Sequence, residues 1–331
     1  MQRNTPDLSV TIVAFDQALA SAITGAHDLF ALAGITWQRI HNQPIKPAFQ
    51  VRLASLHAAP VTCTNQFILQ PQTALEDIDK TDILIVPTIG GDIPRVLQNN
   101  QNLQVHLRRL YHSGADIAGN CTGTFLLAAA GLLANRAATT HWGYAEQFRQ
   151  LFPDVRLQPE KMLTEHDNVF CAGGGMAWID LALLLIERYC GYQVASDTAK
   201  SHVLDMSRPN QTMYAGTRQH KFHQDHAILA IQDTLDKQFR SAVSLQSLAH
   251  QHNMTPRTLT RRFQRATGLT PIKYLQTVRI ERAMKLLETP HNALEKIVTE
   301  IGYDDVSSFS RLFKRHTGLS PSQYRAKFKR N

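Results

Sequence analysis

Long apolar runs are absent from this 331-residue chain. The richest stretch, Leu181 to Ile186, lies between Asp180 and Glu187 and is far shorter than the roughly 18 residues that a membrane-spanning helix needs. The first residues, MQRNTPDLSVTIVAF, lack the apolar core that follows a basic start in a signal peptide, and they are typical of a strand. We therefore expect no membrane partner.

Cysteine is also scarce. The four cysteines, Cys63, Cys121, Cys171 and Cys190, are too few for a disulfide scaffold, and no two of them have the spacing of a zinc site. A reduced, cytoplasmic compartment is the default for such a protein. We expect no metal and no cofactor. With 43% apolar and 19% charged residues the chain is not disordered, and its length suits two domains.

Positive charge is confined to the last third. Residues 226–331 carry 18 Lys and Arg against 8 Asp and Glu, whereas residues 1–225 carry 17 against 19. Such asymmetry favours a polyanion partner held by one module, because each phosphate contact by Lys or Arg releases condensed counterions. A merely soluble basic domain is the alternative, and charge alone does not decide between them.

The same third contains a repeat. Residues 266–274 read ATGLTPIKY, and fifty residues later 316–324 read HTGLSPSQY. Each copy predicts a helix-turn-helix. In the first copy Thr255 is a suitable N-cap for the second helix, and Gly268 a suitable C-cap. In the second copy Asp304 or Asp305 begins the corresponding helix and Gly318 ends it. Two copies are too few for a solenoid, so we expect a duplicated unit.

The second helix of each copy carries a cationic, hydroxyl-rich face. Such a face suits the major groove, where Arg pairs with guanine edges and small hydroxyl residues permit close approach. An ordinary solvated helix face is the alternative, but the faces recur and carry almost no acid. The predicted DNA-binding residues are Arg257, Thr258, Thr260, Arg261 and Arg265 in the first copy, and Ser307, Ser308, Ser310, Arg311, Lys314 and Arg315 in the second.

Residues 271–288 predict a helix between the two units. Its length would be about 27 Å at 1.5 Å per residue. A strut of that length can set two recognition helices near one DNA turn apart, about 34 Å. The two units would then read successive segments of the major groove on one face of the duplex.

The arrangement resembles the DNA-binding domain of the AraC/XylS family. The resemblance covers Ala227 to Phe328 and includes both helix-turn-helix units, the linking helix and the closing segment IGYDDVSSFSRLFKRHTGLSPSQYR. It implies sequence-specific binding to double-stranded promoter DNA and, most often, activation of transcription. RNA polymerase and a second copy of the chain are the implied protein partners.

The N-terminal two-thirds alternate strand-like and helical segments. This alternation predicts an α/β sheet with parallel strands, which binds ligands at the carboxyl ends of the strands. We expect strands at 8–15, 49–54, 83–86 and 115–118, and helices at 22–33, 96–111, 122–130 and 176–189.

Two loops follow predicted strands. In the first, Gly90 and Gly91 would let backbone amides approach an anion. The second, GNCTG at 119–123, has the spacing of a nucleophile elbow that exposes Cys121. A small buried residue is the alternative for this cysteine. No His or acid adjoins it, although His141 could approach from elsewhere as a structural or ligand-contacting group. The predicted ligand-binding residues are Gly90, Gly91, Cys121, Thr122 and His141.

These residues resemble the class I glutamine-amidotransferase-like, or ThiJ/PfpI, fold. More specifically they resemble the GlxA-like branch of AraC regulators, through the segments VAFDQALASAITGAHDLF, CTGTFLLAAAGLL, RAATTHW and GGGMAWIDLALLLIE. The resemblance implies a flavodoxin-like doubly wound sheet. Hydrolytic relatives carry a His where this chain has Thr122, and an acid where it has Ala22 or Ala26. The implication is a retired active site, without catalytic residues, that senses a small nitrogen-containing metabolite.

We therefore predict a metabolite sensor at 1–205, a linker at 206–225 and a DNA-binding domain at 226–331. An active cysteine hydrolase or amidase with a DNA-binding tail is the alternative, and a constitutive DNA binder with an inert first domain is a third. His220, His223 and His226 have a spacing that permits metal ligation, but no Cys or Glu completes a tetrahedral set, so we expect a solvated linker there.

Overall fold

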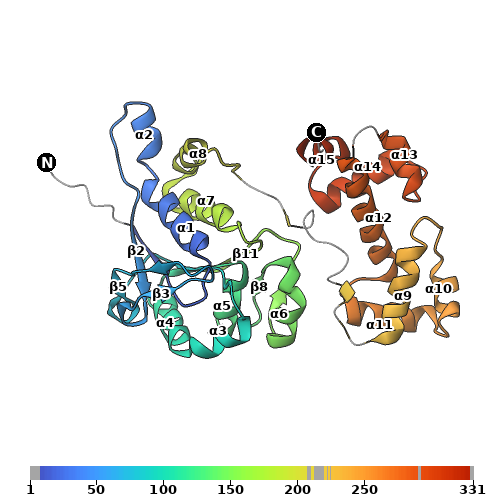
Figure 1. Ribbon diagram of the computed structural model, residues 1–331, viewed down its shortest axis with the longest axis horizontal. Helices are drawn as coiled ribbons and strands as arrows, with labels where there is room; N and C mark the ends of the chain where they lie inside the picture. The colour runs from blue at the N-terminus through green and yellow to red at the C-terminus, as the bar shows by residue number, and fades with distance from the viewer. Residues whose placement is uncertain are drawn as a thin grey trace. The chain divides into compact units, whose positions relative to one another are not determined.

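The computed structural model describes residues 8–206, 210–211, 220–221, 223, 225–289 and 292–328. The chain divides into two compact units, Met1–Gln211 and Thr212–Asn331 (Figure 1). The predicted linker at 206–225 therefore lies largely outside the described residues. Within the described part of the chain, no helix is both long and apolar enough to span a membrane.

The first unit is built on a seven-stranded sheet in the order β10-β11-β7-β6-β1-β2-β5. Every strand pair in it is parallel except β10 with β11. The sheet is therefore mixed rather than purely parallel, because only Asp167 and Asn168 connect β10 to β11, too few residues for a crossover. The strands are β1 Leu8–Val13, β2 Phe49–Ser55, β5 Thr73–Ala74, β6 Ile83–Val86, β7 Asp116–Asn120, β10 Leu163–His166 and β11 Val169–Ala172.

Helices cover both faces of this sheet (Figure 1). The helices α1 Ala20–Leu32, α7 Trp178–Cys190 and α8 Tyr192–Ser201 lie on one face, and α3 Ile93–Asn99, α4 Gln101–His112 and α5 Thr124–Ala129 lie on the other. This is a doubly wound, flavodoxin-like arrangement, so the predicted fold class is confirmed for the first unit.

Shorter elements complete the first unit. Two small sheets pair β3 Val61–Thr62 with β4 Ile68–Leu69 and β8 Ala137–Ala138 with β9 Arg156–Leu157. Short helices are α2 Thr36–Ile40, α6 Ala145–Leu151, η1 Leu56–Ala58, η2 Leu75–Asp77, η3 Cys121–Gly123 and η4 Trp142–Tyr144.

Two predicted boundaries near the strand ends are wrong. The helix expected at 96–111 is broken at Asn100, whose side-chain amide donates to the carbonyl of Val96 at 2.8 Å and competes with continued helix. The strand expected at 115–118 runs to Asn120, so Gly119 belongs to the strand and the turn begins at Cys121.

The second unit is all helical. Its helices are α9 His226–Lys237, α10 Leu245–Gln251, α11 Pro256–Thr267, α12 Pro271–Glu288, α13 Leu294–Glu300, α14 Val306–Thr317 and α15 Pro321–Phe328. Two hydrophobic cores lie along α12. Tyr274 to Val278 join the core around Phe263, and Ile280 to Leu287 join the core around Phe313. The predicted pair of helix-turn-helix units is confirmed, and they share one helix.

Candidate nucleic-acid interface and sensor site

The caps fix where the two recognition helices begin and end. The hydroxyl of Thr255 accepts from the amide of Thr258 at 3.2 Å, and Gly268 ends α11 in the left-handed region at φ 74°. Asp305, rather than Asp304, caps α14, and its carboxylate accepts from the amide of Ser308 at 2.6 Å. Hydrogen bonds from Ser308 to this carboxylate lower the pKa of Asp305. The two recognition helices therefore begin and end at equivalent positions.

The buried faces of α11 and α14 are held by matching contacts. Phe263 and Phe313 are fully buried. The hydroxyl of Thr267 donates to the carbonyl of Phe263 at 2.8 Å and accepts from the amide of Leu269 at 3.1 Å. Thr317 makes the same two contacts at 2.9 and 3.2 Å. With one face fixed in this way, the opposite face of each helix is directed to solvent.

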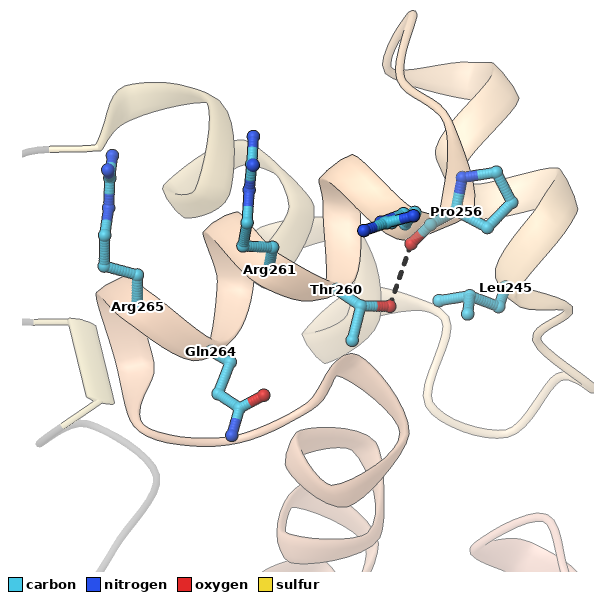
Figure 2. A pocket seen from close by; sticks show the side chains of 7 residues that line it. Leu245, Pro256, Thr260, Arg261, Gln264 and Arg265 are labelled. Atoms are coloured by element: carbon cyan, nitrogen blue, oxygen red, sulfur yellow. Dashed lines mark hydrogen bonds between the residues drawn. The ribbon is translucent and has the colours of Figure 1, made fainter.

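The solvent face of α11 carries three arginines one turn apart. Arg257, Arg261 and Arg265 are exposed and border an open groove of about 660 Å³. Figure 2 shows Arg261 and Arg265 extended in the same direction. Thr258 and Thr260 are half-buried, and the hydroxyl of Thr260 already donates to the carbonyl of Pro256 at 2.9 Å. The arginines therefore form the part of this face best placed to meet a nucleic acid.

The solvent face of α14 has a different composition. Ser307, Ser308, Arg311, Lys314 and Arg315 are exposed, whereas Ser310 is half-buried. A guanidinium nitrogen of Arg311 donates to the hydroxyl of Ser308 at 3.2 Å, which restrains the arginine along the helix. All eleven predicted DNA-binding residues thus lie on two helices of one unit.

Sequence reasoning missed Gln264. It lines the same groove as Arg261 but points away from the two labelled arginines in Figure 2. The fifty-residue offset could have found it, since the equivalent position in the second copy is Lys314. A glutamine amide pairs well with adenine in the major groove.

Of the described residues before α9, His220, His223 and Asp225 contact the DNA-binding unit, so the solvated linker expected here is wrong at these residues. Arg262 forms two hydrogen bonds with the carboxylate of Asp225, at 2.7 and 3.1 Å. Burial acts to raise the pKa of Asp225, but hydrogen bonds from Arg262 and from the amide of Ile228, together with nearby positive charge, outweigh it, so the pKa is lowered. His220 contacts the carbonyl of Thr267 at 3.1 Å, and His223 contacts Gln232 at 3.0 Å. Among the described residues, no group of three or more His, Cys, Asp or Glu could hold a metal ion.

In the first unit, the 119–123 loop has elbow geometry. Cys121 adopts φ 56°, in the left-handed region that is strained for a residue with a side chain. A Cβ at Gly123 would lie 2.3 Å from the carbonyl oxygen of Pro87, and one at Gly119 would lie 2.7 Å from Leu127. Both glycines are therefore required for the turn that positions Cys121.

The elbow cysteine is poorly placed for nucleophilic chemistry. Cys121 is only 3% exposed. Burial raises the pKa of its thiol, and hydrogen bonds with Thr122 and Thr88 oppose that change only in part. The hydroxyl of Thr122 donates to the carbonyl of Ile89 at 2.7 Å. At neutral pH the sulfur is therefore a thiol rather than a thiolate.

His141 is held away from proton-transfer chemistry by its own loop. Its Nδ1 accepts from the amide of Gly143 at 3.0 Å, and burial lowers the pKa of the ring. The ring lies beside Trp142 and Tyr144. The loop nevertheless touches the elbow, since the hydroxyl of Thr140 donates to the carbonyl of Cys121 at 2.8 Å.

The two loop glycines pack against the end of β1. The amide of Gly90 donates to the carbonyl of Gln17 at 2.8 Å, so it is not free to cradle an anion as the sequence suggested. A Cβ at Gly91 would lie 2.8 Å from the side chain of Gln17, and one at Gly90 would lie 2.1 Å from the hydroxyl of Thr64. These glycines permit close packing between neighbouring loops.

Asn120 is a buried polar residue that sequence reasoning passed over. Its amide nitrogen donates to the hydroxyl of Thr88 at 2.7 Å, whereas its carbonyl oxygen has no partner among the described residues. Thr88 also influences the thiol of Cys121. Because the strand was expected to end at residue 118, the sequence placed Asn120 in the loop and gave no sign that it is buried.

Gln211 anchors the end of the first unit beside the elbow loop. It is 1% exposed, and its amide nitrogen donates to the carbonyls of Thr140 at 2.8 Å and Lys161 at 3.2 Å. Its carbonyl oxygen accepts from the amide of Trp142 at 3.2 Å. A Cβ at Gly173 would lie 2.3 Å from this side chain. The last residue of the unit is therefore fastened to the loop that contacts Cys121.

Comparison with known proteins agrees with this organisation. Residues 10–187 match the DJ-1/PfpI family, and residues 248–327 match a helix-turn-helix domain. The first unit has the fold of a ThiJ/PfpI family protein from Pseudomonas syringae, with a TM-score of 0.52, 16% identity and coverage of 62% of this chain and 78% of that one.

Three curated relatives are informative. The HTH-type transcriptional regulator CdhR of Pseudomonas aeruginosa is 28% identical, over 87% of this chain and 85% of that protein. The HTH-type transcriptional regulator GlxA of Rhizobium meliloti is 27% identical, over 66% and 68%. The isonitrile hydratase of Pseudomonas putida is 29% identical, over 61% and 89%. Because the family match spans more than half of the sequence, the chain belongs to the DJ-1/PfpI family, and with its AraC-type helix-turn-helix domain it has the organisation of the GlxA-like AraC/XylS regulators.

Proposed function

We propose that this protein is a transcriptional regulator that binds promoter DNA through α11 and α14 and responds to a small metabolite through its first unit. The observation that carries the proposal is the pair of capped cationic helix faces supported by one shared helix. Two of the relatives are named as HTH-type transcriptional regulators, which supports the same class. We assign sensing to residues 1–205, connection to 206–225 and DNA binding to 226–331.

The shared helix gives the DNA-binding proposal a geometric basis. α12 has 18 residues and contributes to both hydrophobic cores. The two helix-turn-helix motifs therefore cannot rotate independently without disrupting one of these cores. Its length of about 27 Å is compatible with successive major-groove segments on one face of DNA. Arg261 and Arg311 occupy equivalent positions and are the residues that we expect to contact base edges.

Fluorescence anisotropy tests this interface, with DNA that the wild-type protein selects from a random pool. We expect Arg261→Ala and Arg311→Ala each to weaken binding by about 5- to 100-fold, because each removes one charged contact of about 1–3 kcal/mol. Lys285→Ala on α12 is the control for loss of one positive charge. Unchanged affinity in both arginine variants would contradict the proposed interface.

We propose that Gln211 couples the two functions. Eight residues separate Gln211, fastened beside the elbow loop, from His220, fastened to α11. The nine Cα-to-Cα steps from Gln211 to His220 span at most about 32 Å when extended. A shift at the elbow loop would therefore be passed to the DNA-binding unit over a short connection. We further propose that the metabolite contains nitrogen and that the protein is a homodimer in the cytoplasm. We also propose that it contacts RNA polymerase and activates rather than represses transcription.

Hydrogen exchange tests the coupling without knowledge of the metabolite. Linkage is reciprocal, so DNA binding should change amide exchange at residues 120–122 in the wild type. Gln211→Glu keeps the side-chain volume but removes the donor to Thr140, and we expect it to abolish that change while DNA affinity is retained. An identical exchange response in the variant would contradict coupling through Gln211, and no response in the wild type would favour an inert first unit.

A cysteine hydrolase is the second candidate. The elbow and the similarity to an isonitrile hydratase favour it. The raised pKa of Cys121, the threonine at position 122 and the neutral His141 weigh against it. We expect no turnover of amides or isonitriles. Turnover that disappears in Cys121→Ser would overturn this part of the proposal.

A further inference from the structure

The two helix-turn-helix motifs are connected at a second place besides α12. Residues 239–241 lie between α9 and α10, and Phe239 packs against the hydrophobic core of the first motif. The same segment contacts the turn between α13 and α14, which belongs to the second motif. Arg240 and Glu300 form an ion pair at 3.0 Å across this contact, although they are 60 positions apart in the sequence. Because this arginine is largely exposed, the ion pair contributes little by itself.

Gly302 is the residue of the turn that lies against the 239–241 segment. It adopts φ 82°, in the left-handed region. A Cβ at this position would overlap the carbonyl oxygen of Arg240 and would lie 2.9 Å from its carbonyl carbon. These are backbone atoms, so no change of side-chain rotamer could make room for a larger residue. The contact between the turn and the segment therefore requires glycine.

The first motif shows that the turn by itself does not require glycine. Asn253 occupies the position equivalent to Gly302, adopts φ 53° and is exposed. The amides of Met254 and Tyr303, which follow the two turn residues, donate to equivalent carbonyls at 2.9 and 3.0 Å. Asparagine is one of the few residues with a side chain that tolerates the left-handed region. The two turns are therefore alike, and the glycine of the second turn provides the space that the carbonyl of Arg240 occupies.

Arg279, in the middle of α12, contacts both the segment and the turn. Its Nε donates to the carbonyl of Phe239 at 2.7 Å, and a terminal guanidinium nitrogen donates to the carbonyl of Ser241 at 3.0 Å. The centre of the same guanidinium lies 5.0 Å from the centroid of the Tyr303 ring. A planar group with several donors can hold two carbonyls and stack on a ring at the same time. Arg279 therefore joins the segment of the first motif to the turn of the second.

This second connection opposes bending of α12. The shared helix prevents large rotations of one motif against the other, but long helices still bend. A bend near the middle of α12 would move α14 relative to α11. The contacts of Gly302 and Arg279 lie at the level where such a bend would occur, and they join the motifs beside the helix rather than along it. The relative orientation of the two recognition helices is therefore fixed at two places.

We propose that Gly302 and Arg279 are positioning residues that set the number of base pairs the protein accepts between its two half-sites. They act by fixing α14 relative to α11 through the 239–241 segment, and they do not read bases. One added base pair moves a half-site by about 3.4 Å and turns it by about 35° around the duplex. A rigid pair of helices rejects that change, whereas a pair that bends tolerates it. The inference rests on the proposed DNA binding and does not depend on an effector.

Fluorescence anisotropy with a series of duplexes tests the inference. The half-sites are those that the wild-type protein selects from a random pool, and their separation varies from three base pairs fewer to three more than the selected spacing. We expect wild type to lose about tenfold or more in affinity at one base pair from that spacing, and Gly302→Asn and Arg279→Gln to lose about threefold or less. The preferred half-site sequences should be unchanged in both variants.

Matched variants separate positioning from other effects of substitution. Asn253→Gly alters the equivalent turn of the first motif, and Lys285→Gln removes one exposed positive charge from the same helix as Arg279. Both should keep the wild-type dependence on spacing. Thermal unfolding of each protein shows which variants are folded at the assay temperature. If Gly302→Asn is not, Arg279→Gln provides the test.

The outcomes distinguish this inference from the proposed function. Folded Gly302→Asn and Arg279→Gln proteins with the spacing dependence of wild type would overturn the inference and leave DNA binding standing. A wild-type protein that binds all spacings equally would also overturn it. A wild-type protein that selects no pair of half-sites would contradict the proposed function, and the inference with it.

Discussion

The two helix-turn-helix units of the second half are alike inside and different outside. Phe263 and Phe313 fill equivalent core positions, and Thr267 and Thr317 make the same pair of hydrogen bonds. The closing tyrosines also correspond. Tyr274 donates to Asp236 and Tyr324 donates to Glu288, each at 3.0 Å. The duplication has kept the residues that build the fold.

The solvent faces have diverged at two of the equivalent positions. Arg257 corresponds to Ser307, and Gln264 corresponds to Lys314. Arg261 and Arg311 are unchanged. We propose that the first helix-turn-helix motif therefore offers more side chains for base readout, whereas the second offers a shorter side chain and a point charge suited to phosphate. We infer that the first helix-turn-helix motif supplies more of the sequence discrimination, and that the second supplies more of the sequence-independent affinity.

The largest expected effect comes from variants in the two hydrophobic cores of the helix-turn-helix motifs. Phe263→Ala and Phe313→Ala should each destabilise the second unit by about 3–5 kcal/mol, because each removes a fully buried aromatic ring. Since α12 belongs to both cores, we expect either variant to raise amide exchange in both repeats. Exchange that rises only in the mutated repeat would show that the two cores are independent.

Exchanging the arginine and the serine tests unequal base readout. Arg257→Ser should cost about 1–3 kcal/mol of DNA binding and relax sequence preference in one half of the site. Ser307→Arg should tighten binding with little gain in discrimination. Selected-sequence profiles of both variants provide the measurement. A uniform loss across all sequences in Arg257→Ser would mean that Arg257 contacts only phosphate.

Substitution of Gln264 and of Lys314 should affect the salt dependence of DNA binding differently. Lys314→Gln should lower the slope of log affinity against log salt by about 0.9, as expected for the loss of one phosphate contact. Gln264→Ala should leave that slope unchanged while altering base preference. Titrations at several salt concentrations measure both effects. Equal slopes for Lys314→Gln and wild type would contradict the assignment of Lys314 to phosphate.

A smaller difference between the two repeats concerns the pH dependence of their stability. Burial lowers the pKa of His316, whose counterpart in the first repeat is Ala266. The unfolded chain therefore protonates His316 near pH 6.5, whereas the folded unit does so only at lower pH. The free energy of unfolding is not reduced by this effect above about pH 6.5, and it falls as the pH drops through and below that value. Denaturant unfolding from pH 7.5 to 5 should show this slope, and His316→Gln should reduce it.

Periodicity and capping residues were enough to predict the two helix-turn-helix motifs and the helix between them, although not α9 and α15 of the same unit. Thr255, Gly268 and Gly318 act locally, and the repeat supplied an internal comparison that identified the buried faces. Periodicity alone did not single out Gln264, and only its equivalence to Lys314 in the second copy points to it. It also failed for Asp225, since Arg262 contacts it from 37 positions away in the sequence.

In the first unit, the doubly wound fold and the elbow geometry followed from local pattern and family resemblance, but the contacts of the candidate ligand residues did not. Gly90 was predicted to bind an anion with its amide, yet that amide contacts Gln17. Gln17 and Gly90 follow separate strands, and nothing in a local window of sequence reveals their proximity. Contacts between distant segments were the information missing from the sequence.

The central claim is that both recognition helices, held by α12, read one duplex at the same time. Its most direct test is the affinity for selected DNA in which five base pairs are inserted between the two half-sites, measured against the parent sequence. Half a helical turn moves one half-site to the opposite face, so the account predicts a loss of about tenfold or more. An affinity that is indifferent to the insertion would contradict it.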